Sequence, residues 1–125
     1  MTRKHAALTG VAATLLIGLT AASIAYAGTG SSKFTVKRIE LDFYRDTVSV
    51  MPYEQSGMIN PRGCGDDDWY ELWTGRTTSD RNEAAILALS AMVGKLYMSA
   101  TIATGSCSAN DRPAFSALRV YAEND

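Results

Sequence analysis

The sequence lacks most of the residues that enzymes use for catalysis. Its one histidine is His5, and its only cysteines are Cys64 and Cys107. Ser-His-Asp catalysis, Cys-His catalysis and the usual histidine-containing zinc sites therefore have no residues to build them. General acid-base work would fall to carboxylates, tyrosine or lysine, and no spacing of carboxylates specifies a reaction. We expect a protein that is not an enzyme and that has no cofactor.

Clusters of basic residues are also missing. The chain has 12 Lys and Arg against 13 Asp and Glu, and it has no basic run. Because a basic patch is the electrostatic footprint of nucleic-acid binding, we do not expect nucleic acid as a partner. Asp66, Asp67 and Asp68 form the one dense acidic cluster, but calcium loops alternate their ligands along the chain. We interpret this cluster as a solvated turn and predict no metal site.

The first 27 residues have the features of a secretory signal peptide. A basic start at residues 3–5 precedes an apolar stretch over residues 8–24, and Ala25-Tyr26-Ala27 has the small-x-small pattern of a cleavage site. An uncleaved anchor is the alternative, since about 20 apolar residues span a bilayer. We expect cleavage after Ala27, export to the periplasm or the extracellular space, and no membrane association afterwards.

After the signal peptide, the sequence predicts a flexible leader at residues 28–33 and a single domain over residues 34–122. Alternation of apolar and polar residues indicates strands, and a change of phase near Arg38 indicates a bulge. The turn of the first hairpin is expected at residues 45–47. The expected strands cover residues 34–44, 48–52, 69–74, 95–102 and 114–121, with one helix between the third and the fourth.

That helix is the best-marked element of the chain. Asp80 and Glu83 have the spacing of a capping pair, with Ser79 as an alternative cap. Residues 84–93 are apolar except for one serine, and Gly94 follows where a left-handed residue ends many helices. A helix that is apolar nearly all round is expected to be covered on more than one side.

We expect one stripe of this helix to face the sheet: Ile86, Leu89 and Val93. Leu87 and Met92 then need a second cover, which is either the long loop of residues 54–68 or another copy of the chain. Since exposed apolar patches usually mark interfaces, we predict a homo-oligomer with Leu87 and Met92 at its interface.

Cys64 and Cys107 are an even pair behind an expected signal peptide, which predicts a disulfide. It would tie the loop before the third strand to the loop before the fifth. The chain-entropy model gives such a bond about 4 kcal/mol of stabilisation. A redox-active pair is not favoured, because the C-x-x-C spacing is absent.

Aromatic residues close to polar loop residues provide a candidate binding site. Trp69 and Trp73 are four residues apart, so both face the same side of a strand. Aromatic faces beside Asp, Asn and Arg suit recognition of a sugar or a protein, while ordinary core packing is the other interpretation. The candidate ligand-binding residues are Trp69, Trp73, Tyr97, Asp67 and Arg112.

Four stretches carry a resemblance to known proteins: NPRGC at residues 60–64, Trp69-Tyr70, AILALSAMVGK at residues 85–95, and GSC at residues 105–107. They resemble a group of small exported bacterial proteins with a single disulfide, mostly of unassigned function. The order of strands and helix is similar to that of the OB-fold, in which a helix lies between strands three and four. More distantly, the chain is similar to the receptor-binding B subunits of AB-type toxins such as subtilase cytotoxin and pertussis toxin.

This resemblance implies a mainly β fold with one helix, an OB-like five-stranded antiparallel barrel of order β-β-β-α-β-β. A small open α+β sheet with one packed helix is the alternative. The implied function is an exported binding module that recognises a glycan or a cell-surface protein in the manner of a toxin B subunit. The alternative function is a secreted or periplasmic inhibitor or accessory protein that binds an enzyme as a monomer.

Overall fold

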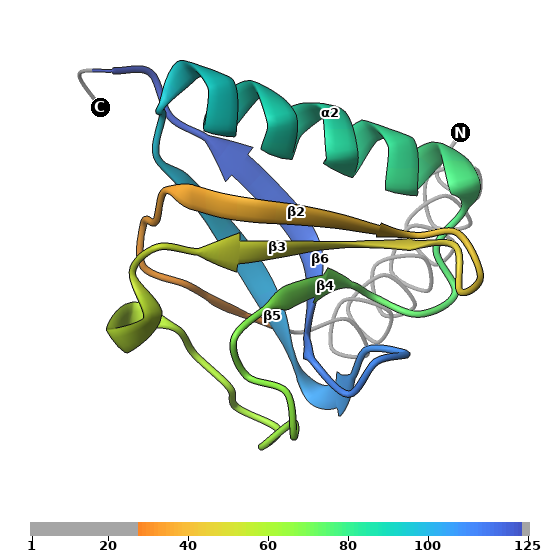
Figure 1. Ribbon diagram of the computed structural model, residues 1–125. Helices are drawn as coiled ribbons and strands as arrows, with labels where there is room; N and C mark the ends of the chain where they lie inside the picture. The colour runs from red at the N-terminus through yellow and green to blue at the C-terminus, as the bar shows by residue number, and fades with distance from the viewer. Residues whose placement is uncertain (1–27, 124–125) are drawn as a thin grey trace, which may run out of the picture.

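The computed structural model describes residues 28–123, so the expected signal peptide lies outside the described residues. Within them the chain forms a six-stranded mixed sheet with one α-helix packed against it (Figure 1). The helix is α2 (Thr78–Gly94). The other elements are β1 (Gly28–Gly30), β2 (Val36–Asp42), β3 (Thr47–Pro52), the 3₁₀ turn η1 (Gln55–Gly57), β4 (Tyr70–Leu72), β5 (Met98–Cys107) and β6 (Pro113–Val120).

The expectation of a closed antiparallel barrel of five strands is wrong. The strands follow each other in the order β1-β5-β6-β4-β3-β2, so β1 and β2 are the two edges of an open sheet. β4 runs parallel to β6, since α2 carries the chain from β4 across to β5 and a hairpin returns it to β6. The coarser expectation, a mainly β chain with one helix, is confirmed.

Two local features of the strands bear on the site. The bulge expected near Arg38 is confirmed by a shift of register between Val36 and Arg38. The leader, by contrast, is not wholly irregular, because Gly28–Gly30 pairs with β5 as an edge strand. A Cβ atom on Gly28 would lie 2.8 Å from the carbonyl oxygen of Ile102, so this close approach requires glycine.

The ends of α2 differ from the expected caps. Thr77 is the N-cap: its side chain accepts from the Asp80 N–H at 3.1 Å, and the Asp80 carboxylate accepts from the Thr77 N–H at 3.2 Å. Asp80 is therefore the second partner of the capping box, not its first residue. At the other end the left-handed residue is Lys95 (φ 54°, ψ 39°), while Gly94 still belongs to the helix.

The face of α2 that contacts the sheet consists of alanines. Ala84, Ala88 and Ala91 are buried. The residues expected in their place are instead 65%, 51% and 74% exposed; they are Ile86, Leu89 and Val93. That expectation is wrong because valine and aromatic side chains of the sheet already fill the space between the layers. Small residues let the helix lie close to them.

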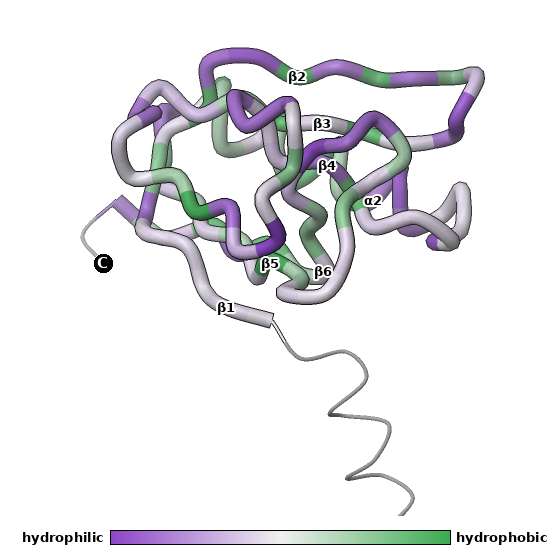
Figure 2. Tube along the Cα trace, turned by 90° about the horizontal axis from the view of Figure 1, so that it is seen from below, coloured by the Kyte–Doolittle hydropathy of each residue, from purple (hydrophilic) through white to green (hydrophobic). Residues whose placement is uncertain are grey.

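The loop of residues 53–69 closes the core at the end away from α2. Met58 and Ile59 pack against the core, and the Ile59 N–H donates to the Tyr70 hydroxyl at 2.9 Å. Residues 54–68 therefore do not provide the expected second cover of the helix. The underside of the molecule, seen in Figure 2, shows loop segments and β1, with hydrophobic positions scattered among hydrophilic ones.

The predicted disulfide is present. Cys64 and Cys107 are joined with a Cα–Cα distance of 5.8 Å, which ties the loop of residues 53–69 to the end of β5. Among the described residues, no helix combines the length and the apolar character needed to cross a bilayer.

Candidate binding surface

A network of polar side chains lies over the outer face of β2, β3 and β4, with Glu71 at its centre. Glu71 alternates along β4 with the core residues Tyr70 and Leu72, so its side chain points to the opposite face. Its neighbour across the sheet in β3 is Ser49. Glu71 is fully buried (0% exposed), and a carboxylate in that position needs hydrogen-bond donors.

Three residues supply those donors. The Ser49 hydroxyl donates to Oε2 of Glu71 at 2.6 Å, and the Asn110 side-chain amide donates to the same oxygen at 2.7 Å. The Asn110 backbone N–H donates to Oε1 at 3.1 Å. The guanidinium of Arg112 contributes a longer contact of 3.4 Å to Oε2. With both oxygens occupied, Glu71 is an anchor for the loop that carries Asn110 and Arg112, not a free general base.

Arg112 connects this anchor to the surface. Its Nε donates to Asp66 at 2.9 Å, and its Nη1 donates to Glu40 at 3.0 Å and to Ser49 at 2.8 Å. Burial lowers the pKa of Arg112, but the bonds to Asp66 and Glu40 outweigh it, so the pKa lies above its ordinary value. The guanidinium also stacks 4.7 Å from the centre of the Trp69 ring. Such stacking favours arginine over lysine.

The network continues to the turn between β2 and β3. Asn110 donates to Asp42 at 3.2 Å and accepts from the Arg45 guanidinium. The Arg45 N–H, the Asn110 amide and the Tyr44 N–H all donate to Asp42, which lowers the pKa of this carboxyl. Beyond these bonds Tyr44 is 94% exposed and its neighbour Phe43 is 74% exposed. We call the surface from Tyr44 to Trp69 the polar strip: Glu40, Asp42, Tyr44, Arg45, Asp66, Trp69, Asn110 and Arg112.

The five candidate ligand residues do not form one site. Trp69 and Arg112 come together in the polar strip, and Asp67 is exposed on the loop beside them. Trp73 follows the other end of β4, where it borders a small hollow with residues 45–47 and 74–76. Tyr97 is 49% exposed between α2 and β5, and its carbonyl accepts from the Tyr121 N–H.

The sequence pattern does not indicate Ser49 and Asn110 as parts of a site or Phe43 and Tyr44 as an exposed pair, and it offers Glu71 only as a carboxylate whose spacing specifies no reaction. One signal was available in the sequence WYELW at residues 69–73. A carboxylate inside a short aromatic strand is either exposed or buried with partners, and only the second choice requires polar residues from distant loops.

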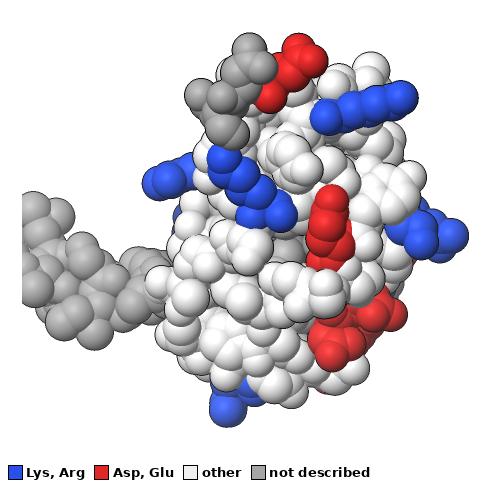
Figure 3. Space-filling model, turned by 90° about the vertical axis from the view of Figure 1, so that its left-hand side faces the viewer, with Lys and Arg blue, Asp and Glu red and all other residues white. Residues whose placement is uncertain are grey.

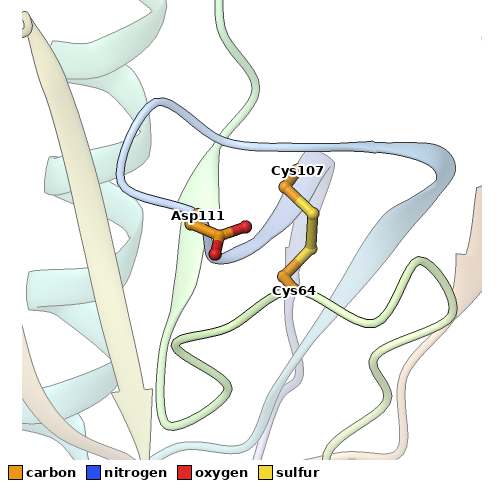
Figure 4. Close-up of side chains that lie close together, drawn as sticks. All are labelled: Cys64, Cys107 and Asp111. Carbon is orange, nitrogen blue, oxygen red and sulfur yellow. A yellow bond between two sulfur atoms is a disulfide. The ribbon is translucent and has the colours of Figure 1, made fainter.

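The disulfide and Asp111 form a second small cluster next to the strip (Figure 4). The sulfur atoms of Cys64 and Cys107 and a carboxylate oxygen of Asp111 lie within 4.8 Å of one another. Both sulfurs are in the disulfide, so they offer no thiolate to a metal ion. Asp111 instead accepts from the Gly65 N–H at 3.0 Å, and its carbonyl accepts from the Asp66 N–H at 2.9 Å. This cluster fastens the loop that presents Asp66 to Arg112.

Comparison of the chain with protein-family models, with curated proteins and with solved structures finds no significant match. The resemblance to toxin B subunits therefore has no support beyond the sequence stretches that suggested it.

Proposed function

We propose that the protein is an exported binding module, not an enzyme, and that it recognises a glycan or a surface protein through the polar strip. The observation that carries this proposal is the position of Arg112, which is stacked on Trp69 and held by acidic partners on both sides. Recognition groups that are fixed before binding lose little conformational freedom when the ligand arrives.

The chemistry of the strip suits the hydroxyl-rich, flat surface of a sugar. We place the sugar against the side of the Trp69 ring that Arg112 does not cover, beside the side chains of Glu40 and Asp66, which keep 46% and 42% of their surface exposed. Stacking with a few fixed polar groups is the usual composition of a small-ligand site. The disulfide, which needs an oxidising compartment to persist, supports export.

A glycan array with the exported form tests this proposal. Trp69→Ala is expected to abolish binding, while Tyr97→Ala, a matched change at an exposed aromatic outside the strip, leaves it intact. Equal binding by both variants and the wild type, or an array without any reproducible signal, contradicts glycan recognition by the strip.

The hairpin tip favours a second candidate, the monomeric inhibitor or accessory protein that binds another protein. Phe43 and Tyr44 are exposed side by side at the turn, and the Arg81 guanidinium lies 5.5 Å from the Phe43 ring. Exposed aromatic and arginine side chains are frequent anchors of protein interfaces. A photo-crosslinking amino acid at position 44 is expected to capture one defined protein in the native compartment, whereas the same probe at position 97 does not.

We also propose that the protein associates with itself through α2. The outer stripe of the helix (Ile86, Leu89 and Val93) is uncharged and 51–74% exposed. Leu87 and Met92, the residues first expected at the interface, lie on the flanks of this stripe. Leu87 borders the hollow next to β6, and Met92 packs partly against the core.

A further inference from the structure

A cleft of about 490 Å³ lies between the last turns of α2 and the start of β2, on the side of the helix away from β6. This volume is in the range of small-molecule sites, which are mostly 300–1,000 Å³. The cleft has no residue in common with the polar strip. Its lining residues are Thr35, Val36, Lys37, Tyr53, Ala91, Met92 and Lys95.

The way α2 packs on the sheet explains why the cleft is there. Figure 1 shows that the helix and β2 diverge toward the end of the helix. Ala91 is the last buried helical residue, and its short side chain leaves room beside Val36, where the bulge begins. Val36 and Ala91 are buried and Met92 is partly buried, so the base of the cleft is apolar.

The rim of the cleft is cationic, although the chain as a whole has a net charge of −1. Of the three lysines in the described residues, Lys37 and Lys95 line the cleft, while Lys33 lies over the Tyr121 ring. The Lys37 ammonium is 5.9 Å from the centre of the Tyr53 ring. Figure 3 looks onto the end of the molecule where β2 begins, and it shows basic side chains spread over this end, with acidic side chains among them, on a mostly uncharged surface.

Two negative features lie close to the cleft, but neither removes its positive rim. The Glu54 carboxylate is occupied by the Thr35 N–H and hydroxyl, both at 2.8 Å. The C-terminal end of a helix carries a partial negative charge of about half a unit. Here the N–H groups of Lys95 and Leu96 bond its last carbonyls. The two lysines therefore carry more positive charge than the Glu54 carboxylate and the helix end carry negative charge, and no acidic residue among residues 28–123 lines the cleft.

From this combination we propose that the cleft binds a small amphipathic anion, a molecule with an apolar body and one carboxylate, sulfonate or phosphate head. The body lies on Val36, Ala91 and Met92, and the Tyr53 ring forms one wall. The head lies at the rim between Lys37 and Lys95. This inference does not depend on the function proposed for the polar strip.

Titration with 1-anilinonaphthalene-8-sulfonate, followed by competition with decanoate, tests the proposal. The wild type is expected to bind the dye saturably and to release it to decanoate but not to decan-1-ol.

The double variant Lys37→Gln/Lys95→Gln is expected to bind the dye and decanoate at least about tenfold more weakly. The double variant Arg62→Gln/Arg119→Gln, with the same change of net charge at exposed positions outside the cleft, serves as the control. Met92→Trp fills the cleft at constant charge and is also expected to weaken binding; urea unfolding verifies that each variant is folded.

Three outcomes overturn the proposal: no saturable binding by the wild type, equal weakening in the arginine control, or equal competition by decan-1-ol. Sedimentation with phosphatidylglycerol vesicles then separates two sources of the same chemistry. Vesicle binding that is lost with the lysines points to a lipid headgroup, and binding of decanoate alone points to a free acid. Both results support an anion site in the cleft.

Discussion

Arg112 and Glu71 are brought together from a loop and a strand that are 41 residues apart, with Nη1 of the arginine 3.4 Å from Oε2 of the glutamate. The glutamate is fully buried, while the arginine side chain keeps 11% of its surface exposed. One end of the pair is therefore part of the interior, and the other reaches the polar strip. The conformation of the strip depends on a carboxylate that a ligand cannot touch.

Removal of the Glu71 carboxylate is expected to destabilise the domain strongly. Glu71→Leu removes the acceptor of the Ser49 hydroxyl and of the Asn110 N–H groups, and breaking a buried charged network of this kind costs about 3 kcal/mol. Glu71→Gln keeps the shape and should cost about 1–2 kcal/mol. The measurement is the free energy of unfolding in urea, with the exposed Asp67→Asn as the control, for which less than about 0.5 kcal/mol is expected. Similar values for all three variants would show that the network contributes little.

The disulfide is expected to hold the loop of the strip as well as the fold. Cys64 and Cys107 close a loop with a sequence separation of 43, for which the chain-entropy model gives about 4 kcal/mol. Thiol labelling of the exported protein should find no free thiol. The double variant Cys64→Ala/Cys107→Ala should lower the free energy of unfolding by a few kcal/mol and weaken ligand binding by the strip. Two reactive thiols in the native exported protein contradict this prediction.

Several features of the fold could be predicted from the sequence because they are local. The helix, the hairpin with its bulge and the last two strands depend on neighbouring residues, and their existence was predicted correctly. The disulfide could be predicted because only two cysteines are present. Sheet closure and the parallel pairing of β4 with β6 depend on contacts between distant segments, and no short pattern specifies them.

The orientation of α2 shows a second limit. Alanine and leucine are both apolar, so hydrophobic periodicity cannot distinguish an alanine face at the core from a leucine face at the core. The deciding quantity is the space that the sheet leaves, and this depends on Val48, Val50 and Phe115 in three different strands. The polar strip could not be predicted because its residues meet only in the folded chain. Asn110 and the Glu71 carboxylate that anchors it, for example, are 39 residues apart in the sequence.

Tyr70 is expected to make the stability fall at alkaline pH. Burial raises the pKa of this buried tyrosine above its ordinary value of 10.0, and the hydrogen bond from the Ile59 N–H opposes this only in part. Above pH 10 the unfolded chain loses the Tyr70 proton while the folded chain keeps it, so the free energy of unfolding decreases as the pH rises. The stabilising contribution is complete below pH 10 and is lost toward the higher pKa of the folded state.

Urea unfolding between pH 8 and pH 11 measures this effect. Tyr70→Phe should flatten the alkaline decrease, at a cost of about 1 kcal/mol at neutral pH for the lost acceptor of the Ile59 N–H. Tyr97→Phe, at a half-exposed position, should keep the wild-type profile. An unchanged slope in Tyr70→Phe would assign the alkaline effect to other groups.

Self-association through α2 is expected to be weak and dependent on concentration. In a symmetric helix pair, the three stripe residues of each copy bury their remaining surface, which contributes roughly 6–10 kcal/mol in total. Association costs about 4–15 kcal/mol of lost freedom, so at most about 6 kcal/mol remains, which favours a dimer only at concentrations of tens of micromolar or higher. Analytical ultracentrifugation should find a mass that rises with concentration.

Leu89→Glu, at the centre of the stripe, should abolish this rise, whereas Ser56→Glu on the exposed η1 turn should preserve it. Leu87→Glu tests the flank next to β6, and we expect a smaller effect there than at Leu89. A monomer at all concentrations, or a dimer that Leu89→Glu leaves unchanged in a folded protein, rules out this interface.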